Sequence, residues 1–129
     1  MKKILFVEDE AALQTTLGGA LQKEGFAVVA ARDGETGLHL AASEHPDLIL
    51  LDLILPKRSG FQVLEALKSD AKTRDIPVIV LTNLESAKDV DRALALGATT
   101  FLVKASYEID EVITKVRQEL QSGATGVSA

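Results

Sequence analysis

An aspartate directly follows a continuous aliphatic run near the middle of the sequence. Asp52 stands after residues 48–51 and before three further aliphatic residues and Pro56. An uninterrupted apolar run of this kind is typical of a strand buried on both faces. An ionised carboxylate inside such a strand would be costly to desolvate. We therefore expect Asp52 to close the strand and to face a polar pocket, where a carboxylate can act as a ligand or a nucleophile.

Polar side chains also follow other apolar runs of the chain. The runs span 4–7, 26–31, 48–51, 77–81 and 101–103, and the polar residues after them include Glu8, Asp9, Asp52, Thr82 and Lys104. If the runs are parallel strands, their carboxyl ends lie at one edge of the sheet, which is where ligands bind in open α/β sheets. We expect these side chains to converge in one crevice.

Three carboxylates gathered in one crevice repel one another. At about 5 Å and an effective dielectric constant of about 20, each pair costs roughly 3 kcal/mol. Because one lysine cannot offset that repulsion, a divalent cation is expected. A ligand set of oxygens without His or Cys favours Mg²⁺, with Mn²⁺ as the alternative. A metal-bound Asp52 beside Lys104 and the Thr82 hydroxyl could accept a phosphoryl group.

The segments between the apolar runs have the spacing of helices. This spacing is clearest in residues 13–21, 61–67, 90–94 and 109–120. Asp33 and Ser106 are candidate N-caps, and Gly25 and Gly97 are expected just past helix ends. The alternation of strand and helix predicts an α/β protein with a flavodoxin-like five-stranded parallel sheet, in the order 2-1-3-4-5, with helices on both faces.

Length and composition indicate one folded domain. The chain has 129 residues, of which 47% are hydrophobic, and it has no cysteine. One sizeable core fits this length, and disulfides, thiol catalysis and cysteine-bound zinc are excluded. We expect one domain over residues 1–121 and a flexible C-terminal tail over 122–129, which is rich in Gly, Ser and Ala.

Charge and hydropathy limit the classes of partner and the cellular locations that can be expected. The net charge is −5, and the 14 Lys and Arg residues are scattered along the chain. Direct nucleic-acid binding is therefore not expected, because phosphate contacts need clustered basic residues. No apolar run approaches the roughly 18 residues of a membrane span, and the N-terminus does not resemble a signal peptide. We expect a cytoplasmic protein without membrane contact.

The chain resembles the response-regulator receiver domains of bacterial two-component signalling, which include the chemotaxis regulators. The matching motifs are "LFVEDE" (5–10), "LILLDLILPKRSG" (48–60), "PVIVLTN" (77–83) and "ATTFLVK" (98–104). Each motif alone is weak evidence for the family, but the order and spacing of the four motifs together are specific to it. The resemblance covers residues 1 to about 120.

The resemblance implies a phosphoacceptor switch that depends on Mg²⁺. Asp52 would take the phosphoryl group from a histidine kinase or a phosphotransfer protein. Asp9 would bind Mg²⁺ directly and Glu8 through water, with Asp52 and the backbone carbonyl of Ile54 as further ligands. Such a domain is not an enzyme acting on other substrates, because it catalyses only its own phosphorylation and dephosphorylation.

The resemblance also implies a route from the phosphoryl group to an output surface. Lys104 would pair with the phosphoryl group, Thr82 would close onto it, and Phe101 would turn inward on activation. Because Thr82 and Phe101 flank the fourth helix, we expect a downstream protein to bind the face formed by the fourth helix, the fifth strand and the fifth helix, and residues 82–107 to respond to phosphorylation. The resemblance leaves open whether the domain forms a homodimer.

Four positions depart from the family's usual pattern. Ala105 replaces the proline that usually follows the lysine, and a cis peptide there would cost about 3 kcal/mol without proline. Asn83 is larger than the usual residue and could narrow access to Asp52. Ile54 and Leu84 are apolar where polar residues help to orient the hydrolytic water. We therefore expect slow self-dephosphorylation.

Each candidate residue also has a simpler interpretation when it is taken alone. Residues 8–10 could be an acidic cluster at a helix start, and Asp52 could be a strand-end cap. Thr82 could cap a helix, Lys104 could be a surface lysine, and Phe101 could belong to the core. The predicted topology places these residues together, so the simpler interpretation would have to hold for all of them at once. That coincidence disfavours it.

Three other functions occur in proteins of this topology, and the sequence argues against each. An aspartyl-nucleophile phosphohydrolase needs a second aspartate two residues after the first, where this chain has Ile54. A flavin-binding electron carrier needs a Ser/Thr-rich phosphate loop after the first strand, where this chain has three acids. A receiver-like module that is never phosphorylated is disfavoured because Asp52, Thr82 and Lys104 are all present.

Overall fold

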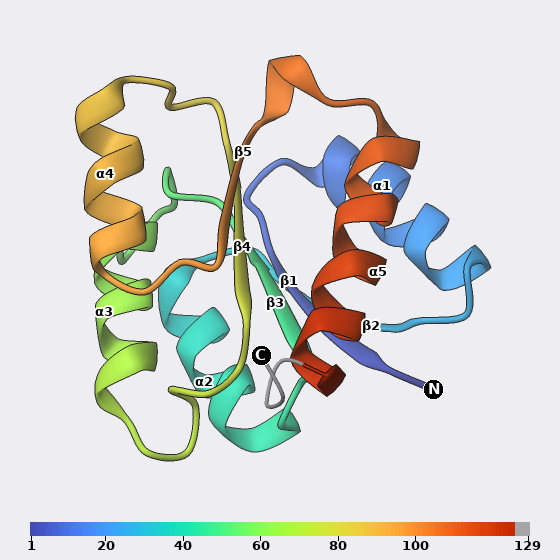
Figure 1. Cartoon of the computed structure of the whole chain (residues 1–129), viewed down its shortest axis with the longest axis horizontal. Coiled ribbons are helices and arrows are strands. Elements are labelled where there is room, and N and C mark those ends of the chain that lie inside the picture. Colours follow the sequence, from blue (N-terminus) through green and yellow to red (C-terminus); the bar gives the residue numbers. More distant parts are fainter. Residues whose placement is uncertain (126–129) are drawn as a thin grey trace.

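The chain forms a parallel sheet with helices on both faces. The computed structural model describes residues 1–125, and their side chains as far as Gln121. The five strands are β1 (Lys3–Val7), β2 (Ala27–Ala31), β3 (Leu48–Leu51), β4 (Val78–Thr82) and β5 (Thr100–Val103). The helices are α1 (Ala11–Lys23), α2 (Gly34–Glu44), α3 (Gly60–Ser69), α4 (Ala87–Ala95) and α5 (Ile109–Thr125), with a short 3-10 helix at Lys104–Ser106. The strand order is β2-β1-β3-β4-β5, which confirms the predicted topology (Figure 1).

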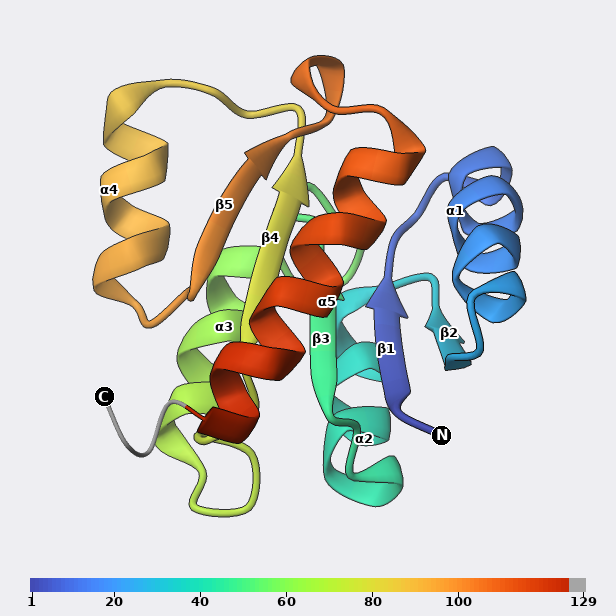
Figure 2. The same ribbon diagram turned by 45° about the vertical axis from the view of Figure 1, so that its right-hand side comes forward.

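The sheet separates two layers of hydrophobic core. Along β1, Leu5 and Val7 belong to one layer, and Ile4 and Phe6 belong to the other. The first layer includes buried residues of α2, α3 and α4, and the second includes buried residues of α1 and α5. Figure 2 shows α5 and α1 on the near side of the strands and α3 and α2 behind them. Because both faces are covered, β3 is apolar at every position, and so are β1 after Lys3 and β4 before Thr82.

The register of the sheet brings the predicted strand ends to one edge. Val7, the last residue of β1, pairs with Leu51, the last residue of β3, and Thr82 of β4 pairs with Val103 of β5. The amide of Asp52 donates to the carbonyl of Val7 at 3.1 Å, so the chain leaves β3 directly beside the end of β1. The expected convergence of the strand ends is therefore confirmed.

The helix ends agree with the sequence in three of the four predicted positions. The Asp33 carboxylate accepts from the Thr36 amide at 2.8 Å at the start of α2. Gly25 and Gly97 follow α1 and α4 with φ of 96° and 109°. The prediction that Ser106 caps the last helix is wrong, because Ser106 ends the 3-10 helix and α5 begins only at Ile109.

A side chain of α5 itself explains the later start of this helix. The Glu111 carboxylate accepts from the Glu108 amide at 2.8 Å, so the exposed donor at the helix start has an acceptor without Ser106. The peptide bond between Lys104 and Ala105 is trans.

The last helix extends further along the chain than the sequence predicted. α5 continues to Thr125, within the segment 122–129 that was expected to be a tail, and residues 126–129 lie outside the described part of the chain. None of the described helices is long and apolar enough to cross a lipid bilayer.

Gly60 lets α3 approach the end of β3, and this contact generates a prediction. A Cβ at Gly60 would lie 2.2 Å from the carbonyl oxygen of Asp52 and 2.4 Å from the Cα of Leu53. Because both atoms are backbone, Gly60→Ala must displace the loop that carries Asp52. We expect it to lower the free energy of unfolding by about 2 kcal/mol or more, measured by urea denaturation.

Gly19→Ala is the matched control, because nothing lies within 4 Å of a Cβ built at Gly19 inside α1. This variant should be more stable by up to about 1 kcal/mol. Equal stability of the Gly60→Ala variant and the wild type would show that the close approach is not needed.

Candidate functional site

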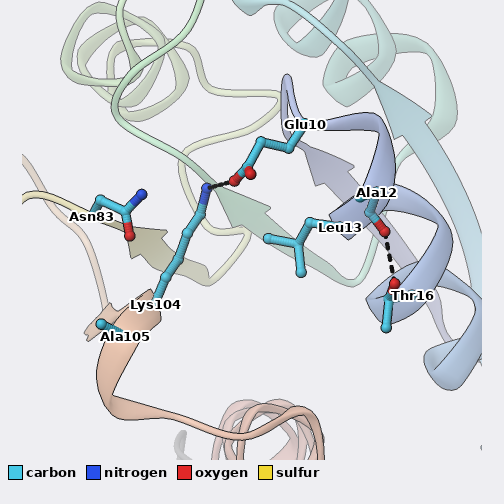
Figure 3. A pocket seen from close by; sticks show the side chains of 7 residues that line it. All are labelled: Glu10, Ala12, Leu13, Thr16, Asn83, Lys104 and Ala105. Carbon is cyan, nitrogen blue, oxygen red and sulfur yellow. Dashed lines mark hydrogen bonds and ion pairs between the residues drawn. The ribbon is translucent and has the colours of Figure 1, made fainter.

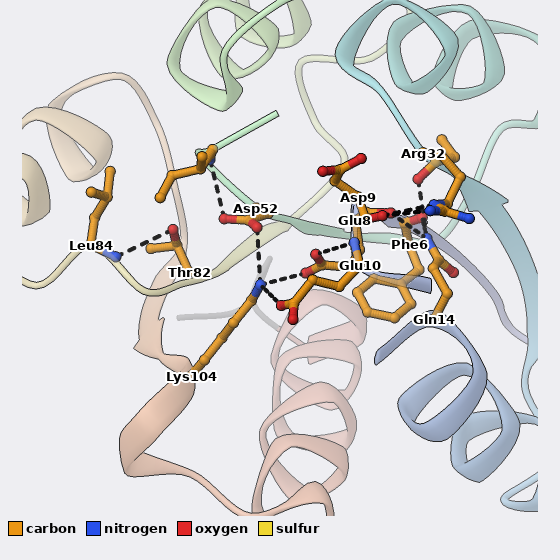
Figure 4. A network of polar contacts seen from close by, with 12 residues as sticks. Phe6, Glu8, Asp9, Glu10, Gln14, Arg32, Asp52, Thr82, Leu84 and Lys104 are labelled. Carbon is orange, nitrogen blue, oxygen red and sulfur yellow. Dashed lines mark hydrogen bonds and ion pairs between the residues drawn. The ribbon is translucent and has the colours of Figure 1, made fainter. Parts of the chain in front are cut away.

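Three carboxylates surround one ammonium group at the carboxyl edge of the sheet. The Nζ atom of Lys104 lies 2.8 Å from Glu8 Oε1, 2.9 Å from Glu10 Oε1 and 3.0 Å from Asp52 Oδ2 (Figure 4). Glu8 is fully buried and Asp52 is 5% exposed, whereas the Glu10 side chain is largely exposed. One cation thus joins residues that follow β1, β3 and β5.

Burial and the shared lysine determine the charges in this cluster. Burial raises the pKa of the Glu8 carboxyl, and the nearby Asp52 charge adds to the rise, although hydrogen bonds from Lys104 and the Glu10 amide oppose it. Burial alone would lower the pKa of Lys104, but hydrogen bonds to Glu8, Glu10 and Asp52 outweigh this and raise it well above its usual value. Lys104 therefore remains a cation.

A small cavity opens beside Asp52. It has a volume of about 160 Å³ and is lined by Glu8, Asp9, Glu10, Asp52, Ile54, Asn83 and Lys104. The Oδ1 atom of Asp52 accepts from the Ile54 amide at 3.2 Å, and Oδ2 faces Lys104. The Asp9 carboxylate has neither a hydrogen bond nor an ion pair with any of the described residues.

A wider hollow adjoins the Lys104 side of the cluster. Its volume is about 420 Å³. Figure 3 shows that its lining comes from α1 and the residue before it, the segment after β4 and the 3-10 helix: Glu10, Ala12, Leu13, Thr16, Asn83, Lys104 and Ala105. Glu10 reaches across the mouth of this hollow to Lys104.

The oxygen donors at the small cavity fit a hard divalent cation. Asp9, Asp52 and Ile54 line it together, and carboxylate and carbonyl oxygens are the ligands that Mg²⁺ prefers. Within the described residues, no three His, Asp or Glu side chains already stand in a metal-binding arrangement. Lys104 occupies the space between Glu8, Glu10 and Asp52, so Asp9 provides the carboxylate that is free for a cation.

Thr82 is the last residue of β4, and Phe101 lies in β5, the strand that contacts α4. Thr82 is fully buried, and its Oγ1 accepts from the Leu84 amide at 3.5 Å. Phe101 is partly buried and packs against the core layer of α2, α3 and α4. Both residues thus lie at the β4–β5 side of the site. No hydrogen bond joins Thr82 or Phe101 to Asp52 among the described residues.

The sequence did not single out two residues that hold the acidic segment. Nε2 of Gln14 donates to the carbonyls of Phe6 at 3.0 Å, Glu8 at 3.2 Å and Ala31 at 3.1 Å. Arg32 donates to the carbonyl of Asp9. The position of Arg32, directly after a strand that ends at the same edge, was the available signal. Its partner is a backbone oxygen, which side-chain patterns do not reveal.

Comparison with known proteins assigns the family. The family model of the response regulator receiver domain matches residues 4–117. The DNA-binding dual master transcriptional regulator RpaA of Synechocystis sp. is 38% identical over 121 residues, which are 94% of this chain and 50% of RpaA. The phosphate regulon transcriptional regulatory protein PhoB of Escherichia coli (strain K12) is 36% identical over 116 residues, which are 90% of this chain and 50% of PhoB.

Solved structures are similar over nearly the whole chain. A CheY-like response regulator receiver domain protein from Methanospirillum hungatei JF-1 matches with a TM-score of 0.91 and 25% identity, covering 98% of both chains. The BeF3-activated receiver domain of Klebsiella pneumoniae RstA matches with a TM-score of 0.84 and 29% identity, covering 92% of this chain and 98% of that one.

The chain belongs to the response regulator receiver domain family. It is a receiver domain of the kind found in two-component signalling, as its motifs predicted, and domains of this family generally bind Mg²⁺ for phosphorylation. The chain spans about half the length of the curated relatives it matches.

The shared lysine generates a prediction about stability. Lys104→Met removes the cation that joins Glu8, Glu10 and Asp52, and leaves the two buried carboxylates facing each other. We expect a loss of roughly 3 kcal/mol in the free energy of unfolding, measured by urea denaturation in EDTA. Excess Mg²⁺ should restore part of this free energy of unfolding, because the metal ion supplies positive charge near the carboxylates in place of the lysine.

Lys88→Met is the control, since Lys88 is an exposed residue of α4. Its unfolding midpoint should stay close to that of the wild type. The account of the cluster is contradicted if both lysine variants have the same stability.

Proposed function

We propose that Asp52 is the phosphoacceptor of this receiver domain. The observation that supports this most is the place of its carboxylate: it follows the central strand β3, lines a cavity and lies 3.0 Å from Lys104. A carboxylate beside a fixed cation is suited to attack phosphorus, because the cation offsets charge on the transferred phosphoryl group. No other aspartate among the described residues has all three features.

The proposed transfer forms one bond and breaks one bond. An oxygen of Asp52 attacks the phosphorus of the donor, an acyl phosphate forms, and the donor's leaving group departs. With a histidine kinase or a phosphotransfer protein as the donor, the leaving group is an imidazole nitrogen, and with acetyl phosphate it is acetate. Lys104 then pairs with a phosphoryl oxygen in place of part of its contacts with the carboxylates.

We propose Asp9, Asp52 and the Ile54 carbonyl as the residues that hold Mg²⁺, with Glu8 acting through water. When bound, Mg²⁺ supplies positive charge that neutralises phosphoryl oxygens. Glu8 suits the indirect role, because its carboxylate is fully buried and paired with Lys104. Asp9 suits the direct role, because it lines the cavity and its carboxylate lacks a protein partner within the described residues.

The proposed output surface is the face of α4, β5 and α5, reached through Thr82 and Phe101. Ala93 is the only buried residue of α4, so this helix is loosely attached to the core. An element with little buried surface can shift position at low cost, as a switch requires. We propose that a downstream protein binds this face.

We propose further that the domain acts in the cytoplasm, catalyses only its own phosphorylation and dephosphorylation, and does not bind nucleic acid through its own residues. The net charge of −5 supports the last point. The name of RpaA describes a DNA-binding regulator. The region that matches this chain is only 50% of RpaA.

Phosphorylation is tested by intact mass. Incubation with Mg²⁺ and acetyl phosphate should add one phosphoryl group to the wild type, and Asp52→Asn should abolish this addition because the amide is not a nucleophile of comparable strength. Asp91→Asn, an exposed position on α4, is the control and should be labelled like the wild type. Persistent labelling of the Asp52→Asn variant would show that another residue is the acceptor.

The lifetime of the phosphorylated form generates a further prediction. The Ile54 side chain is 55% exposed beside the cavity, and Leu84 is partly buried near Thr82. Neither side chain has a group that can orient a hydrolytic water, and positioning is most of what this reaction needs. Combining Ile54→Asn with Leu84→Glu should shorten the half-life about tenfold, equivalent to about 1.4 kcal/mol of barrier.

The half-life is followed by the decay of the phosphorylated mass after the donor is removed. Leu94→Gln, a change of an exposed leucine on α4, is the control and should leave the half-life unchanged. An unchanged or longer half-life in the double variant would contradict the proposed effect of the two apolar residues.

A further inference from the structure

Arg32 holds the backbone of the residue that carries the free carboxylate. It follows β2 directly, and its Nε and Nη2 atoms donate to the carbonyl oxygen of Asp9 at 2.9 Å and 2.7 Å. Figure 4 shows the guanidinium beside Asp9 on the side away from Asp52 and Lys104. Two hydrogen bonds from one charged, planar group to the same oxygen restrict the position of the Asp9 carbonyl more than a single bond does.

The residue before Asp9 is held just as firmly. The Glu8 amide donates to the Ala31 carbonyl at 2.9 Å, and the Gln14 side chain donates to the carbonyls of both Glu8 and Ala31. Residues 8 and 9 are therefore attached to the end of β2 through their backbone. Their carboxylates are left to face the cavity and Lys104.

The charges of the site explain what such an attachment can contribute. Asp9 lies between two other acids in the chain, and Lys104 pairs with Glu8 and Glu10 but has no ion pair with Asp9. Repulsion from Glu8, Glu10 and Asp52 favours conformations in which the Asp9 carboxylate turns away from the cavity. A rigidly held peptide limits those conformations, so less ordering is needed when a cation binds.

We infer that Arg32 is a positioning residue for the divalent cation, and that its paired hydrogen bonds to the Asp9 carbonyl hold the Asp9 carboxylate in place for metal binding. The inference rests on the proposed function, which makes Asp9 a ligand. It predicts that Arg32 strengthens Mg²⁺ binding, although its positive charge alone would weaken it. A positive charge near the site repels a cation, whereas the fixed peptide favours binding of the cation.

The opposite signs allow a direct test with two variants. Arg32→Lys keeps the positive charge but loses the planar pair of donors, and Arg32→Met loses both. Mg²⁺ affinity is measured by titration while the amide resonances of Asp9 and Asp52 are followed by NMR. We expect Arg32→Lys to bind Mg²⁺ roughly fivefold to tenfold more weakly than the wild type, and Arg32→Met to bind more weakly than the wild type as well.

Two further measurements separate positioning from general structure. Arg32 is exposed, so both variants should melt close to the wild type in EDTA. Arg74→Met, a change at an exposed arginine between α3 and β4, is the control and should retain the Mg²⁺ affinity. With saturating Mg²⁺, the Arg32 variants should still be phosphorylated by acetyl phosphate, because the nucleophile and Lys104 are unchanged.

The inference is overturned if Arg32→Lys binds Mg²⁺ as the wild type does, or if Arg32→Met binds it more tightly, since Arg32 would then act only through its charge. A lowered melting temperature in EDTA together with an unchanged Mg²⁺ affinity would also overturn it. These results are distinct from a failure of the proposed function, in which the wild type itself neither binds Mg²⁺ nor is phosphorylated.

Discussion

The balance of charge at the carboxyl edge of the sheet is the constraint on which the rest of the site depends. One ammonium group, that of Lys104, lies within 3.0 Å of oxygens from Glu8, Glu10 and Asp52. Burial makes the charged form of the Glu8 carboxyl costly and so raises its pKa. A protein with an excess of buried negative charge at one point is prepared to take up positive charge there. Under the proposed function, a bound divalent cation would offset this excess and the charge of the incoming phosphoryl group.

The fold maintains this concentration of charge without many specialised contacts. The central strands are buried on both faces, so the sheet is rigid where β1 and β3 end side by side. Gly60 brings α3 against the backbone of Asp52, and Arg32 and Gln14 hold the opposite segment through its carbonyl groups. By contrast, α4 buries a single residue. The firm edge and the loosely packed helix suit a domain that converts a local chemical change into a movement of its surface.

The sequence was sufficient for the topology and for the identity of most residues around Asp52. Apolar runs, their spacing and the rules for parallel connections predicted the strand order, which placed Glu8, Asp52, Thr82 and Lys104 at one edge. It was not sufficient for the pairing within the site. Lys104 could have faced any of several acids, and the contacts of Gln14 and Arg32 are made to backbone oxygens. The start of α5 was misplaced because Glu111, a residue inside the helix, provides the acceptor that was assigned to Ser106.

The central claim is that Asp52 carries the phosphoryl group, and chemical mapping of the modified residue tests it most directly. Borohydride reduces an aspartyl phosphate to homoserine, so the phosphorylated protein can be reduced, digested and sequenced by mass spectrometry. The account predicts homoserine at position 52 only when both Mg²⁺ and the phosphodonor have been present. Homoserine at position 9, or no homoserine in a protein whose intact mass shows a phosphoryl group, would contradict it.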